Sequence, residues 1–144
     1  MHSVAQILDE KGRDIWSIGP DDQVYDAIKL MAEKGVGALL VTDGPRLAGV
    51  VSERDYARKV ILQGRSSKST PVRDIMSTNV ITVNSHKTLD QCLAIMTEKR
   101  IRHLPVVEDG QILGVLSIGD LVKRKIADQE HLIESLEQYI TQGG

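Results

Sequence analysis

Cysteine and aromatic residues are almost missing from this chain of 144 residues. The single cysteine, Cys92, excludes an intramolecular disulfide, and nothing else in the sequence points to an oxidising compartment. No apolar run approaches the length that spans a bilayer, and the N-terminus lacks the charged and then apolar segments of a signal peptide. We therefore expect a cytoplasmic protein that has no membrane partner.

A net positive charge and a cluster of metal ligands are also missing. The net charge of −2 argues against a nucleic-acid partner, because a surface that follows phosphates normally makes a domain basic. The four histidines are scattered, and no Cys/His cluster has the spacing of metal ligands. A nucleophile elbow and a Gly-x-Gly-x-x-Gly loop are missing as well. We therefore predict no catalytic residue and no metal site.

What the chain does contain is an internal repeat. The segment from Gly49 to Asp55 (GVVSERD) returns as Gly114 to Asp120 (GVLSIGD), at a spacing of 65 residues (114 − 49). Farther upstream, an apolar pattern recurs at a spacing of 68 residues: Val4, Ile7 and Leu8 match Val72, Ile75 and Met76. A repeat of this length is one supersecondary unit that is used twice. We assign residues 1–61 to the first copy, 62–71 to a linker, 72–126 to the second copy and 127–144 to a C-terminal helix.

Within each copy the apolar periodicity predicts strand, helix, strand, strand, helix. The short first strands are expected at 15–18 and 80–83, the amphipathic helices at 24–31 and 89–96, and the strand pairs at 38–42 with 47–52 and 103–107 with 112–117. The polar, basic linker is either a solvated connection or a source of cations for a ligand. Beyond the second copy, an apolar stripe predicts a helix that packs on its own domain or on a second subunit.

The Gly-x-x-Ser-x-x-Asp motif stands at a predicted strand-to-helix junction in both copies. In the structural interpretation, Ser52 and Ser117 are N-caps, and Asp55 and Asp120 complete a capping box worth ~1 kcal/mol each. In the functional interpretation, the carboxylate accepts hydrogen bonds from a ribose diol, and the serine hydroxyl and free backbone N–H groups hold a phosphate. The glycine would let a ligand approach the backbone closely. Both interpretations can hold for the same residues.

These motifs resemble a tandem pair of CBS domains, the cystathionine-β-synthase motif, which forms a Bateman module. The resemblance covers residues 1–126, including the segments VRDIM at 72–76 and LPVV at 104–107. It implies an α/β (α+β) fold in which two βαββα repeats pack sheet to sheet with pseudo-two-fold symmetry. It also implies a stand-alone regulatory protein of the bacterial signal-transduction type, and not an enzyme.

The resemblance further implies two clefts that each draw on both copies. One cleft would combine Met76, Ile81, Ile101, Arg102, His103 and Pro105 with Ser52, Arg54 and Asp55. The other would combine Leu8, Trp16, Val36, Gly37 and Ala38 with Ser117 and Asp120. Arg54, Arg102 and His103 would then converge on one phosphate. Trp16 is either a core residue or a stacking platform for an adenine.

The ligand that the resemblance implies is an adenine nucleotide: AMP, ADP or ATP, and NAD(H) as a further candidate. Binding would change the arrangement of the copies, and a homodimer would pass the signal to an unidentified effector protein. Two other classes stay open at this point, namely a ligand-free dimerisation module and a nucleotide-processing enzyme. A thermal-shift panel of nucleotides with Asp55→Ala and Asp120→Ala would distinguish them.

Overall fold

The computed structural model describes residues 2–143, which divide into two compact units. The first-repeat unit is Asp14–Ile81, and the second-repeat unit is Met1–Arg13 together with Thr82–Gly144. Helix α1 (Val4–Lys11) therefore belongs to the unit that contains the second repeat, while the 3₁₀ turn η2 (Val72–Asp74) belongs to the unit that contains the first. The segment that begins each copy in the sequence therefore packs with the remainder of the other copy.

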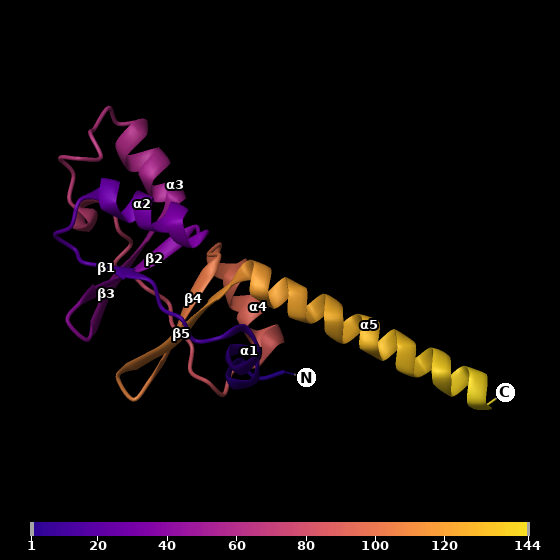
Figure 1. Ribbon diagram of the computed structural model, residues 1–144. Coiled ribbons are helices and arrows are strands. Elements are labelled where there is room, and N and C mark those ends of the chain that lie inside the picture. The colour runs from indigo at the N-terminus through magenta and orange to yellow at the C-terminus, as the bar shows by residue number, and fades with distance from the viewer. Residues whose placement is uncertain (1, 144) are drawn as a thin grey trace. The chain divides into compact units, whose positions relative to one another are not determined.

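The first-repeat unit is a three-stranded sheet with helical segments (Figure 1). Its elements in chain order are β1 (Ser17–Ile18), α2 (Val24–Lys34), β2 (Ala38–Asp43), β3 (Arg46–Ser52), α3 (Glu53–Tyr56), the π-helical turn η1 (Ala57–Ile61) and η2. Strand β1 pairs in parallel with β2, which pairs antiparallel with β3. Helix α2 ends at Gly35, whose φ of 66° is the left-handed conformation that glycine adopts without strain.

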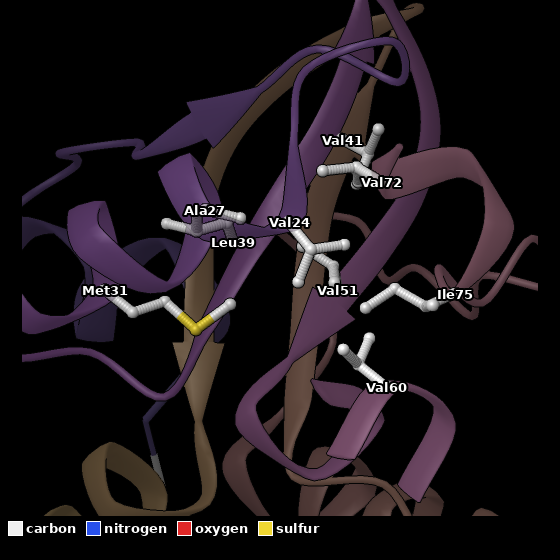
Figure 2. Packing of buried hydrophobic residues seen from close by; sticks show 9 residues of the cluster. All are labelled: Val24, Ala27, Met31, Leu39, Val41, Val51, Val60, Val72 and Ile75. Atoms are coloured by element: carbon white, nitrogen blue, oxygen red, sulfur yellow. The ribbon is translucent and has the colours of Figure 1, made fainter. Parts of the chain in front are cut away.

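The core of this unit lies where α2, the sheet, η1 and η2 meet (Figure 2). Its members are at most 1% exposed: Val24, Ala27, Met31, Leu39, Val41, Val51, Val60, Val72 and Ile75. Three of the four α2 positions of the predicted apolar stripe, namely Val24, Ala27 and Met31, are buried. The helical periodicity therefore identified the inward face of α2 correctly.

The second-repeat unit contains a two-stranded antiparallel sheet. Its elements are α1, α4 (Leu89–Lys99), β4 (His103–Glu108), β5 (Gln111–Ser117) and α5 (Ile118–Gly143). The turn between β4 and β5 holds Asp109 and Gly110, both at positive φ, as a two-residue hairpin of this twist requires. The predicted strand at 80–83 is reduced to one parallel bridge between Val83 and Val106, so this prediction was too long.

Helix α5 is the longest element and extends well past β4 and β5 to the C-terminal end of the chain (Figure 1). Its 26 residues correspond to about 39 Å at the helical rise. Leu121 near its start is fully buried, whereas every side chain from Gln129 to Ile140 is exposed. None of the helices within residues 2–143 combines the length and apolar character needed to cross a membrane.

The basic residues of the linker and of η2, which follows it, engage the first-repeat unit. Arg65 Nη2 lies 2.8 Å from Asp74 Oδ2, and Arg73 pairs with Asp21. Lys68 Nζ lies 4.9 Å from the centre of the Tyr25 ring. All three cations therefore have partners within the first-repeat unit.

Candidate functional site

The Ser-x-x-Asp motif of the first repeat forms the predicted capping box at the junction of β3 and α3. Asp55 Oδ2 accepts hydrogen bonds from the Ser52 amide at 2.9 Å and the Ser52 hydroxyl at 3.1 Å. Ser52 Oγ in turn accepts the Asp55 amide at 3.2 Å. The structural interpretation is thereby confirmed for this copy.

The second repeat has the same arrangement at the junction of β5 and α5. Asp120 Oδ2 accepts the Ser117 amide at 2.9 Å, and Ser117 Oγ accepts the Asp120 amide at 3.1 Å. Neighbouring amides are also occupied, because Glu53 donates to the Gly37 carbonyl and Ile118 donates to the Arg102 carbonyl. Fewer backbone N–H groups are thus free for a phosphate than the sequence suggested, and cationic side chains become the better candidates.

Each motif aspartate has a lysine partner. Lys59 Nζ lies 3.4 Å from Asp55 Oδ1 and donates to the Ile75 carbonyl at 2.9 Å. Lys11 Nζ lies 2.6 Å from Asp120 Oδ2 and donates to the Val115 carbonyl at 2.6 Å. In both copies a lysine therefore joins the motif carboxylate to a backbone carbonyl.

The environment of Asp120 lowers its pKa. Partial burial acts to raise the pKa of this carboxyl, but the hydrogen bonds from Lys11 and Ser117 lower it and prevail. Asp120 is therefore ionised at neutral pH and able to accept hydrogen bonds. Its Oδ1 receives no hydrogen bond from the residues that the structure describes.

The glycine of each motif serves packing. A Cβ at Gly49 would lie 2.7 Å from the Ser77 carbonyl oxygen and 2.9 Å from Met76 Sδ, and a Cβ at Gly114 would lie 2.8 Å from Leu8 Cδ2. Met76 and Leu8 occupy matching positions of the repeat, so the same contact occurs in both units. Protein atoms therefore fill the space on the Cβ side of both glycines, and the expectation that a ligand approaches their backbone stays a prediction.

In each unit the first strand of the antiparallel pair begins beside the motif. Ala38 is paired with Ser52 across β2 and β3, and His103 with Ser117 across β4 and β5. Burial lowers the pKa of His103, and Lys11 and Arg102 lower it further, whereas Asp120 acts to raise it. His103 therefore lies within the electrostatic influence of Asp120, Lys11 and Arg102, all in the second-repeat unit, and its lowered pKa leaves it neutral at pH 7.

The other expected site residues divide between the two units. Trp16, Val36, Gly37, Arg54, Met76 and Ile81 lie in the first-repeat unit with Ala38, Ser52 and Asp55, whereas Ile101, Arg102 and Pro105 lie in the second with His103, Ser117 and Asp120. Arg54 is exposed, and Pro105 is buried. The Trp16 side chain is 37% exposed, and Lys34 Nζ lies 4.4 Å from its ring centre. Leu8 is fully buried and is a core residue.

Sequence reasoning missed the two lysines. Lys59 could have been found, because it lies four residues after Asp55 and such pairs share a helix face. Lys11 is separated from Asp120 by 109 residues, and no local pattern links the two.

Comparison with protein families gives a match to the CBS domain at residues 4–61 and again at 72–127. A CBS domain-containing protein of Arabidopsis thaliana, the mitochondrial CBSX3, is 41% identical over 152 residues, which cover 99% of this chain and 73% of that protein. YhcV of Bacillus subtilis is 28% identical over 126 residues, with coverage of 88% and 89%.

Solved structures show the same fold. A protein from Burkholderia ambifaria MC40-6, described as a signal-transduction protein with CBS domains, is 58% identical and has a TM-score of 0.85 over 89% of this chain and 96% of its own. The CBS domain pair of protein MJ0100, in complex with 5-methylthioadenosine and S-adenosyl-L-methionine, has a TM-score of 0.78 at 22% identity and covers 90% and 98% of the two chains.

Proposed function

The chain belongs to the CBS-domain family, and from this premise we propose that it is a regulatory sensor of adenosine-containing ligands. AMP, ADP and ATP are the first candidates, and NAD(H) is a further one. The observation that carries the proposal is the ionised Asp120 beside a strand start, with one carboxylate oxygen held by the cap and the other available to a ribose diol. Asp55 supplies the same cap geometry in the first-repeat unit.

The cationic side chains around the two aspartates support different preferences. In the second-repeat unit Lys11 pairs with Asp120, and Lys11 and Arg102 both act on the neighbouring His103, so two cations lie near this motif, which favours a ligand that carries phosphate. In the first-repeat unit the cations near Asp55 are Lys59 and the exposed Arg54. We therefore propose that Asp120 serves the more highly charged adenine nucleotide, and that Asp55 serves a less charged adenosine ligand.

The proposed role is regulation without catalysis. A bound ligand changes the population of two conformations only through its different affinity for them, so occupancy is the signal. A homodimer would deliver this signal to an effector protein. We also propose that the protein lies in the cytoplasm.

The experiment is a thermal-shift panel with AMP, ADP, ATP, NAD, NADH and S-adenosylmethionine, followed by calorimetry on each ligand that stabilises the chain. A ligand at 100 times its Kd stabilises the folded state by about 2.7 kcal/mol. Asp120→Ala should abolish the response to phosphorylated ligands, and Asp55→Ala the response to the second ligand class.

Two matched controls remove an exposed aspartate of a different ion pair. Asp90→Ala breaks the pair with Lys125 in the second-repeat unit, and Asp74→Ala breaks the pair with Arg65 in the first. Both controls should keep the full ligand response. A panel without any stabilising ligand, or a response that survives in both motif variants, would contradict the proposal.

A further inference from the structure

The exposed side of α5 has the residue pattern of a coiled-coil seam. Three isoleucines of α5 occur seven residues apart: Ile126, Ile133 and Ile140. An additional residue stands four positions before each of them, namely Val122, Gln129 and Leu136, so the six positions follow one another in alternating steps of four and three residues. In heptad terms the isoleucines occupy position a, and Val122, Gln129 and Leu136 occupy position d. Isoleucine at a with leucine at d favours a two-stranded parallel coiled coil.

This seam is free while another side of α5 is held. Leu121 is fully buried, and Arg124 and Lys125 pair with Glu10 and Asp90 of the same unit. The apolar seam residues are instead 43–70% exposed, and those beyond Gln129 lie on the part of α5 where every described side chain is exposed. A large exposed apolar stripe of this kind marks an interaction surface.

We propose that this seam binds the same seam of a second copy, so that two chains associate through parallel α5 helices. The polar residue in the seam supports the parallel orientation. In a parallel pair Gln129 faces Gln129 of the second copy, and the two amides can hydrogen-bond to each other. In an antiparallel pair Gln129 would face an isoleucine, which leaves a buried amide without a partner.

The flanking charges favour the same orientation. Parallel chains bring position g of one helix beside the following position e of the other, and here these are Lys125 and Glu130. Antiparallel chains would bring position g beside position g, and Lys125 would then meet Lys125, Leu132 or Tyr139 of the other copy, none of which is acidic. In the single chain Lys125 pairs with Asp90, and this ion pair is partly exposed and therefore weak. Lys125 can thus exchange Asp90 for Glu130 of the second copy.

The test is the association state of the full chain, measured by sedimentation equilibrium. We expect a dimer, and Ile133→Glu should weaken its dissociation constant at least a hundredfold, because two charges would be buried in one layer of the seam. Gln138→Glu adds the same side chain outside the seam and should change the constant less than threefold. The urea midpoint of the first-repeat unit, followed by Trp16 fluorescence, should be the same for all three proteins, since residues 133 and 138 lie outside that unit.

The orientation is tested with one introduced cysteine in a chain that carries Cys92→Ala. Leu136→Cys should form a disulfide-linked dimer under mild oxidation, and His131→Cys, outside the seam, should not. The proposal is overturned by a monomeric wild-type chain or by a dimer that survives Ile133→Glu. A dimer that dissociates with Ile133→Glu but fails to link through Cys at 136 overturns the parallel orientation. If the wild-type chain is a monomer and its melting temperature falls with Ile133→Glu, the seam packs against its own chain, and the proposal is overturned.

Discussion

The two Ser-x-x-Asp motifs share one cap geometry but obtain their lysines from different parts of the chain. Lys59 is four residues from Asp55 on the same helical segment, whereas Lys11 reaches Asp120 from α1. An identical local motif thus receives a local ion pair in one unit and a tertiary one in the other. The two copies therefore share the backbone arrangement of the motif and differ in the charged residues around it.

The largest difference is expected at the motif glycines. Gly49→Ala should destabilise the first-repeat unit by about 2–3 kcal/mol, because the new Cβ meets the Ser77 carbonyl, which is backbone and is hydrogen-bonded to Val50. Gly114→Ala should cost about 1 kcal/mol, because it meets a methyl group of Leu8 that can rotate away. Urea unfolding measures both, and Trp16 fluorescence reports the first-repeat unit. Equal losses would show that the two contacts are equivalent.

Removal of the tertiary lysine should affect stability and acid sensitivity together. Lys11→Met should destabilise the folded chain by about 1 kcal/mol at pH 7, since the ion pair is partly exposed and one hydrogen bond is also lost. Because the pKa of Asp120 is lowered on folding, its stabilisation is present above the usual carboxyl pKa and disappears as pH falls through the folded value.

The loss in Lys11→Met should therefore shrink below about pH 4, where carboxyl groups become protonated. Urea titrations at pH 7 and pH 3 measure this change. Lys59→Met is the matched control, because it removes the equivalent lysine of the other unit. A loss in Lys11→Met that is the same at both pH values would contradict the role assigned to Asp120.

A charge swap sharpens the difference between the ligand sites. Arg54 precedes Asp55, whereas Gly119 precedes Asp120, and a Cβ at Gly119 meets only Ser117 Oγ at 3.7 Å. Gly119→Arg should fold normally and stabilise the helix start by up to about 1 kcal/mol. It should tighten a phosphorylated ligand about fivefold through one added charged hydrogen bond of about 1 kcal/mol.

Calorimetry with AMP measures the effect, and Arg54→Gly is the reciprocal variant. It should weaken binding at the Asp55 site without altering the Asp120 site. Unchanged AMP affinity in Gly119→Arg would place position 119 outside the phosphate environment.

The smallest effect is expected from His103, which has Ala38 at the matching position of the first repeat. Burial lowers the pKa of His103 on folding, so the unfolded chain takes up its proton first as pH falls below the usual value near 6.5. The free energy of unfolding should decrease between pH 7 and pH 5 by a fraction of the ~1.4 kcal/mol that one pKa unit represents. His103→Gln should flatten this dependence in urea titrations, and an unchanged slope would assign it to other groups.

Much of the fold followed from local patterns. The apolar stripe of α2, the strand pairs and both capping boxes depend on neighbouring residues, and the structure has them where they were predicted. The first strand of the second repeat was overestimated, because a β-rich run at 80–83 forms a strand only as far as a neighbour pairs with it, and only Val83 does.

The sequence by itself determined the repeat, the order of elements in each copy and the caps that hold Asp55 and Asp120. These features depend on periodicity and on hydrogen bonds within a few residues. Only the tertiary structure decided that Leu8 and Met76 fill the space beside Gly114 and Gly49, and that Lys11 binds Asp120. These contacts join chain segments that are 27 to 109 residues apart (76 − 49 and 120 − 11). Burial of apolar surface brings such segments together, and because it depends on total packing it leaves no local signal in the sequence.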